Sequence, residues 1–243
     1  MATINLASLE AAADAASPAT ELTTIGKSLT TRIAAPIGID ADLDTSDVRL
    51  PRLNLIQKSS ELAEVEGWNP GDIAFVKEVK LIPFGQSGKV TFIHLKRQFQ
   101  EYIPWGSDVR PRVFNTREEV EAAGGSTEFK AVNEYRPIAH FTMLIEKPTT
   151  TKSDAVLDSY FPLEFNGKFY SLAAWTVASS AYKRTADQLI SAAKMFMRDG
   201  IHRYPWELSV EKDKSGTNTF FVPSIKRAGV HSPEMVEFIE NLL

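Results

Sequence analysis

Cysteine is absent from the 243 residues of this chain. Its absence excludes disulfide bonds, thiolate metal sites and cysteine nucleophiles, and it suits the reducing cytoplasm. Long apolar runs are also missing, because no stretch approaches the roughly 18 residues that a membrane-spanning helix needs. Residues 1–20 lack the basic start and apolar centre of a secretion signal. We therefore predict a soluble cytoplasmic protein.

Sequence motifs for catalysis and for nucleotide or metal binding are missing too. The loop at residues 85–88 lacks the Gly-Lys-Ser/Thr ending of a Walker loop, and no GxGxxG or GxSxG pattern occurs. The four histidines are His94, His140, His202 and His231. They are scattered, without HxH or HExxH spacing. Asp40, Asp42 and Asp44 alternate as in a calcium loop, but the glycine and the closing glutamate of that loop are missing. We predict no enzyme activity, no cofactor and no metal site.

Positive charge is scarce overall, since the formal net charge is −4, but it is concentrated in two zones. The first zone contains Lys89, Lys96, Arg97, Arg110 and Arg112. The second contains Lys183, Arg184, Lys194, Arg198 and Arg203. Acidic residues predominate at both ends, in residues 1–48 and 232–243. A local concentration of charge governs partner choice more than the sum does, so a polyanionic partner stays compatible with this composition. Acidic ends can also be merely solvating.

Residues 88–112, GKVTFIHLKRQFQEYIPWGSDVRPR, predict a long strand that runs into an aromatic and basic loop. Alternation would place Ile93, Leu95 and Phe99 on a core face. The opposite, exposed face would carry Phe92, His94, Lys96 and Tyr102. Flat rings interleaved with fixed positive charge are typical of surfaces that hold single-stranded nucleic acid. The alternative is an ordinary amphipathic strand with a solvated face.

The remaining patterns predict a mainly β protein with some helix. We expect strands at 49–60, 72–83, 88–102 and 136–147, the second and third forming a hairpin, and a short helix inserted within 113–135. Further hairpins are expected around Asn166-Gly167 and Ser215-Gly216, with one long helix at 180–199 between them. Trp175 and Trp206 fall in the expected core. A long helix before the last two strands favours an OB-like Greek-key antiparallel barrel. A larger open antiparallel α+β sheet is the alternative.

Three segments follow from this organisation. Residues 1–48 are predicted to be a flexible acidic arm, and residues 49–230 a nucleic-acid-binding domain with insertions. Residues 231–243 are predicted to form an acidic amphipathic helix that begins near Pro233. Its apolar stripe would pack on its own domain, on a second copy or on another protein. We therefore expect some self-association through the terminal segments.

Several segments resemble phage-encoded single-stranded-DNA-binding proteins with an OB fold. They are PRLNLIQKSS, NPGDI, the pattern around YIPW, FYSLAAWTVASSAYKRTADQLI, YPWELSVEKD and NTFFVPSIKRAG, in order over residues 50–230. Many such proteins carry a zinc-binding cysteine cluster after the aromatic strand; here we expect the insertion at 113–135 in its place, and no metal carries over. The resemblance implies a DNA-coating role in phage replication or recombination. It also implies an acidic C-terminal tail that recruits replication or recombination proteins or competes with DNA.

The predicted DNA-binding residues combine cationic and aromatic side chains. They are Lys96, Arg97, Tyr102, Trp105, Arg110, Arg112, Arg136, Lys183 and Arg184. The cations would contact phosphates and the rings of Tyr102 and Trp105 would stack on bases, so binding should depend on salt and little on sequence. Phe92 and Tyr182 are weaker candidates that core packing also explains. A non-enzymatic virion or scaffold protein is the alternative function, and a nuclease or annealing accessory factor is a third.

Overall fold

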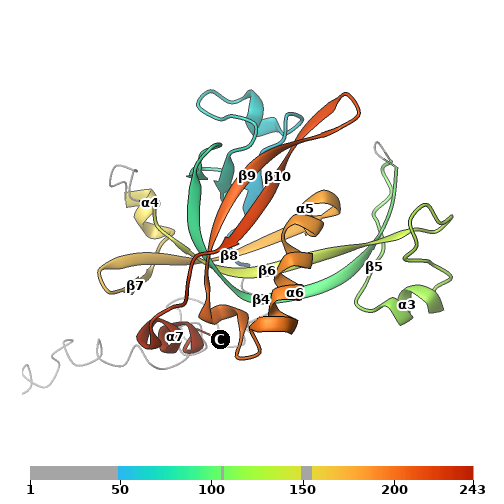
Figure 1. The fold of residues 1–243 in the computed structure, drawn as a ribbon. Helices are drawn as coiled ribbons and strands as arrows, with labels where there is room; N and C mark the ends of the chain where they lie inside the picture. The colour runs from blue at the N-terminus through green and yellow to red at the C-terminus, as the bar shows by residue number, and fades with distance from the viewer. Residues whose placement is uncertain (1–48, 105–106, 149–154, 243) are drawn as a thin grey trace, which may run out of the picture. The chain divides into compact units, whose positions relative to one another are not determined.

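The protein is mainly β, with antiparallel sheets and several short helices (Figure 1). The structure is a computed structural model that describes residues 49–104, 107–148 and 155–242. The chain divides into a unit of residues 49–236 and a second unit of the terminal segments 1–48 and 237–243. The predicted acidic arm, residues 1–48, lies outside the described residues. All of the sheets belong to the unit of residues 49–236.

The larger sheet has the strand order β10-β9-β4-β6-β8-β7, and β5 pairs with β4. Its strands are β4 (Ser87–Glu101), β5 (Val113–Phe114), β6 (Tyr135–Glu146), β7 (Leu163–Phe165), β8 (Lys168–Ala178), β9 (Pro205–Ser215) and β10 (Asn218–Arg227). All of its ladders are antiparallel. The hairpin predicted at Asn166-Gly167 is confirmed, since both residues have positive φ (50° and 72°), as a type I′ turn requires. The hairpin of β9 and β10 is confirmed as well, with Gly216 at φ 59° in its turn.

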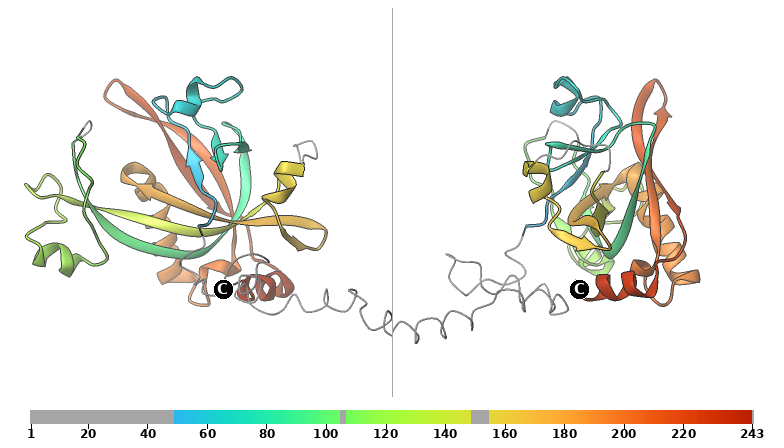
Figure 2. Two further views of the ribbon diagram at one scale, coloured as in Figure 1. Left: turned by 180° about the vertical axis from the view of Figure 1, so that it is seen from behind. Right: turned by 90° about the vertical axis from the view of Figure 1, so that its left-hand side faces the viewer.

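The smaller sheet contains β1 (Leu53–Leu55), β2 (Ile73–Phe75) and β3 (Val79–Ile82). Figure 2 shows this segment beside the β9–β10 hairpin. Two sets of hydrogen bonds connect it to the larger sheet. The Ala174 amide on β8 donates to the Pro51 carbonyl over 2.8 Å. Beyond β1, the Gln57 side chain exchanges two hydrogen bonds with the Phe221 backbone on β10, at 2.7 and 3.0 Å.

The prediction of one strand over residues 72–83, paired with 88–102, is wrong. The segment is itself the β2–β3 hairpin, because Val76 and Lys77 turn the chain with φ values of 49° and 64°. β4 instead pairs with β9, β6 and β5. Valine and lysine rarely adopt positive φ, so the sequence gives no sign of a turn here. The apolar residues on both sides of the turn therefore predicted one continuous strand.

A β-bulge between Phe92 and His94 determines which residues of β4 face the core. Phe92 and Ile93 are both buried, and Phe92 contacts the rings of Phe141 and Trp206. The predicted exposure of Phe92 is therefore wrong, because simple alternation cannot anticipate an inserted residue. The predicted burial of Trp175 and Trp206 is confirmed.

The helix predicted at 180–199 is two helices, α5 (Ser179–Arg184) and α6 (Ala186–Phe196). The break falls at Thr185, which is fully buried and has φ −124° and ψ −68°. Its hydroxyl donates to the Ala181 carbonyl over 2.7 Å, a local bond by which threonine disturbs regular helix. Ala186 and Leu189 of α6 and Met197 directly after it are in the core, while Phe196 is exposed.

The insertion after β4 contains the expected helix, α3 (Arg117–Ala122). Thr116 caps it by accepting a hydrogen bond from the Glu119 amide. The remaining helices are η2 (Glu61–Glu64), α4 (Ala155–Ser159), η3 (Ile201–Arg203) and α7 (Pro233–Glu240). α7 begins at the predicted Pro233. Among the described residues, no helix has both the length and the apolar character needed to cross a membrane.

Candidate nucleic-acid interface

A pocket of about 770 Å³ lies where the ends of β4 and β6 meet α5, the N-terminal residues of α3 and α6, and the tip of the β9–β10 hairpin. We call it the groove. Four cationic residues line it: Arg97, Arg117, Arg136 and Lys183. Four aromatic residues line it: Phe99, Phe129, Tyr135 and Tyr182. Its acidic residues are Glu134 and Asp187. Arg97 and Lys183 come from the two basic zones of the sequence, so the fold brings both zones to one site.

Arg97 is held at the groove wall by two aromatic neighbours. Its guanidinium carbon lies 5.2 Å from the centre of the Phe99 ring. Its side chain also lies near the hydroxyl of Tyr182, a residue that is 4% exposed. Burial raises the pKa of that hydroxyl, and the nearby Asp187 carboxylate raises the pKa further. A neutral hydroxyl can accept from Arg97 and donate to Asp187, which orients the guanidinium without removing its charge.

Arg136 forms a second arrangement of charge and rings. Its guanidinium carbon lies 3.6 Å from the centre of the Tyr102 ring and 5.8 Å from that of Phe129. The same side chain donates to both carboxylate oxygens of Glu134, over 2.7 and 3.2 Å. This bidentate bond lowers the pKa of Glu134. Arg136 is therefore fixed flat against Tyr102, while Phe129 is 74% exposed beside it.

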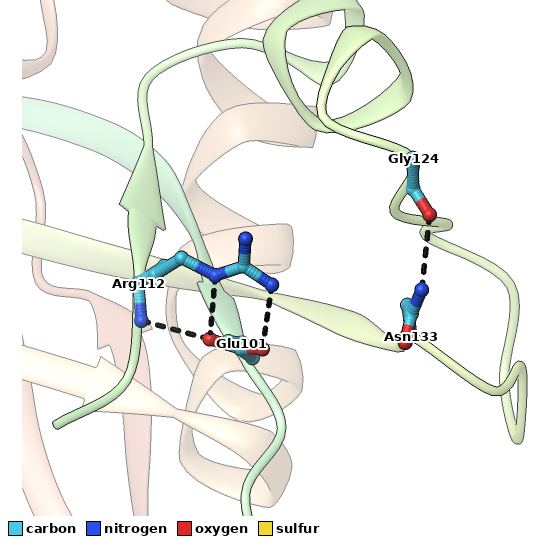
Figure 3. Close-up of polar contacts among 4 residues, drawn as sticks. All are labelled: Glu101, Arg112, Gly124 and Asn133. Carbon is cyan, nitrogen blue, oxygen red and sulfur yellow. Dashed lines mark hydrogen bonds and ion pairs between the residues drawn. The ribbon is translucent and has the colours of Figure 1, made fainter. Parts of the chain in front are cut away.

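Two predicted cations are engaged in ion pairs within the chain. Arg112 donates to the two carboxylate oxygens of Glu101 over 3.1 and 3.0 Å, which joins the start of β5 to the end of β4 (Figure 3). This pairing raises the pKa of Arg112 and lowers that of Glu101. Arg184 lies 3.2 Å from Asp213 and 3.9 Å from Glu211 on β9. Neither arginine lines the groove.

The other predicted residues are divided among several places. Lys96 is exposed on the face of β4 opposite Arg97, because neighbouring residues of a strand point to opposite sides. Tyr102 is 48% exposed and contacts the groove through Arg136. Arg110 is exposed in the loop before β5. Trp105 lies outside the described residues. The structure thus brings together Arg97, Arg136 and Lys183, but not all nine predicted residues.

Sequence reasoning missed two residues of the groove, Arg117 and Phe129. Arg117 is the first residue of α3, and nothing in its spacing connects the insertion to β4. Phe129 lies in EFKAVNEYR, where a ring beside Lys130 repeats the aromatic and basic pattern of β4. That pattern could have indicated Phe129 as a candidate site residue. In the structure, the Asn133 side chain donates to the Gly124 carbonyl over 3.2 Å and bridges the two ends of the loop that carries Phe129 (Figure 3).

Across the described ranges, no three His, Asp or Glu side chains converge in a way that could hold a metal ion. No protein-family model, curated protein or solved structure was found to match this chain.

Proposed function

We propose that this protein binds single-stranded DNA with little sequence preference and protects it during phage DNA replication or recombination. The observation that carries the proposal is the convergence of Arg97, Arg136 and Lys183 in one groove with the exposed ring of Phe129, where Arg136 also contacts the half-exposed ring of Tyr102. The phage context comes from the resemblance of the sequence segments.

The chemistry of the groove fits a flexible strand whose units alternate between phosphate and base. Arg97 and Lys183 would contact phosphates, which makes affinity fall with salt. Phe129 and the Tyr102–Arg136 stack would contact the faces of bases, which every base offers, so sequence preference is small. Glu134 does not oppose a phosphate strongly, because Arg136 already neutralises it.

We also propose that the two sheets together form an OB-like barrel. The larger sheet ends at β10 on one side, and β8 lies near its other side. The smaller sheet is bonded to both of these strands, through Pro51 to β8 and through Gln57 to β10. These links support closure, and an OB barrel is a frequent scaffold for single-stranded nucleic acid.

Fluorescence anisotropy with a labelled oligothymidine at low and high salt tests the proposal. We expect binding that weakens steeply with salt, and similar affinity for a mixed-sequence strand of the same length. The double variant Arg97→Glu/Lys183→Glu should lose at least tenfold in affinity and keep its melting temperature. The control is Lys58→Glu/Lys226→Glu, which reverses two exposed charges that do not line the groove. Absence of binding by the wild type at low salt would leave the scaffold alternative.

A further inference from the structure

The sheet face opposite the groove carries a second group of basic residues. Strand register places Lys96, His140 and Thr176 in one row across β4, β6 and β8. The next row contains His94, Thr142 and Ala174, and a parallel bridge adds Arg52 beside Ala174. We call this surface the rear face and define it by Arg52, His94, Lys96 and His140. Arg52, His94 and Lys96 are exposed.

No negative charge occurs in this part of the sheet. The row that follows contains Gln98, Ile138 and Ala178, so none of the three rows includes an acidic residue. Lys96 and Arg52 lie close enough to His140 to lower its pKa, in addition to the larger effect of burial. An exposed face that carries Lys96 and Arg52, with no acidic residue in these three rows, attracts a polyanion.

The rear face and the groove meet at neighbouring residues of β4. On the side of β4 away from β6, β9 pairs with residues up to Thr91 and β5 pairs from Phe99 onward. Between them, in the described part of the chain, β4 has no strand partner on that side, and the 3-10 helix η3 packs against β4. Lys96 and Arg97 lie next to each other in this stretch, one pointing to each face. These two neighbouring cations are shared between the two faces and suit a flexible, negatively charged DNA strand that contacts both.

We infer that a single DNA strand held in the groove continues from Arg97 to Lys96 and binds the rear face through its phosphates. The inference rests on the proposed function and adds a second contact surface to it. The three rows of the rear face contain no Phe, Tyr or Trp, so its contacts are to the backbone. Short DNA strands bind in the groove alone, and longer DNA strands contact both surfaces.

The length of the DNA strand distinguishes binding to the groove from binding to the rear face. Anisotropy would be measured with oligothymidines of about 6 and about 20 nucleotides, which bracket the usual site sizes of OB folds. We expect Arg52→Glu/Lys96→Glu to lower affinity for the longer strand about tenfold and to change affinity for the shorter strand less than twofold. Loss of two phosphate contacts should also lower the salt slope for the longer strand by about 1.4. Arg97→Glu/Lys183→Glu should weaken both strands.

The same experiment can overturn the inference without touching the proposed function. Equal losses for both lengths, or no loss for the longer strand, would mean that the rear face is not part of the path. A rear-face variant that loses affinity only for a blunt duplex would show that duplex DNA is the occupant, which also overturns the inference. Failure of the wild type to bind either strand would instead reject the proposed function. Lys58→Glu/Lys226→Glu controls for charge reversal, and Arg52→Gln/Lys96→Gln replaces the rear-face variant if its melting temperature falls.

Discussion

Single residues decide where positive charge is available in this protein. Arg97 and Arg136 are oriented by neighbouring rings and line the groove. Arg112, equally basic and close in sequence, is paired with Glu101 through two side-chain hydrogen bonds. The identity of these residues was evident from the sequence, but their partners were not, because each ion pair depends on a register that local pattern does not specify.

Phe129 offers the sharpest test of base stacking. Phe129→Ala should weaken oligothymidine binding by about 1–3 kcal/mol, the usual contribution of a stacked base, which corresponds to roughly 5- to 150-fold. Its ring is 74% exposed, so the melting temperature should hardly change. Phe196→Ala is the matched control, since Phe196 is 72% exposed on α6 and does not line the groove. Equal effects of the two variants in anisotropy would contradict the role of Phe129.

His231 predicts a dependence of stability on pH. Its Nε2 lies 2.8 Å from the Thr91 hydroxyl, and burial, with a smaller effect of His202, lowers its pKa below the ordinary 6.5. As the pH falls below 6.5, the unfolded chain binds a proton at this residue before the folded protein does, so the free energy of unfolding decreases. Urea unfolding at pH 7.5 and 5.5 measures the change. His231→Gln should lose less stability between these values than the wild type or His94→Gln, and an identical loss in all three would refute the assignment.

At the level of elements, the sequence predicted hairpins well where the turn chemistry was explicit. Asn166-Gly167 gave the β7–β8 turn correctly, because both residues tolerate positive φ. The β2–β3 turn escaped prediction, since Val76 and Lys77 adopt the same kind of backbone without either signal. The break at Thr185 escaped for a related reason: a buried threonine hydroxyl, and not a glycine or proline, separates α5 from α6.

The β2–β3 turn can be improved. Lys77 is exposed and has φ 64°, a conformation that costs about 1 kcal/mol for a residue with a Cβ and little for glycine. Lys77→Gly should therefore raise the free energy of unfolding by up to about 1 kcal/mol, measured by urea denaturation. Lys58→Gly, at an exposed position without positive φ, should lower it by about 0.5–1 kcal/mol. Destabilisation by both variants would argue against strain at Lys77.

Across the whole molecule, the mainly β character and the order of most strands followed from the sequence, but the grouping of the predicted cations did not. Lys96 and Arg97 are neighbours in sequence and are separated by the sheet, whereas Arg97 and Lys183 are distant in sequence and share the groove. Such groupings depend on which strands pair, a property of the complete fold. The net charge of −4 is equally uninformative about the groove.

Self-association through the terminal segments stays a prediction from the sequence. Met235 and Val236, two apolar residues of α7, are buried within the chain and are not available to a second copy. We therefore expect weak association, seen in sedimentation velocity as an average sedimentation coefficient that rises with protein concentration. A coefficient that is independent of concentration would reject this prediction.

The bulge in β4 changes which positions of the strand point toward the core. Before it, even-numbered positions such as Val90 and Phe92 point inward; after it, odd-numbered positions such as Leu95, Arg97 and Phe99 share that side. If β4 ran from Phe92 to Arg97 in strict alternation, without the bulge at Ile93, Lys96 would lie on the side that Arg97 now occupies. One extra residue thus decides which basic side chain of β4 reaches the groove and which reaches the rear face.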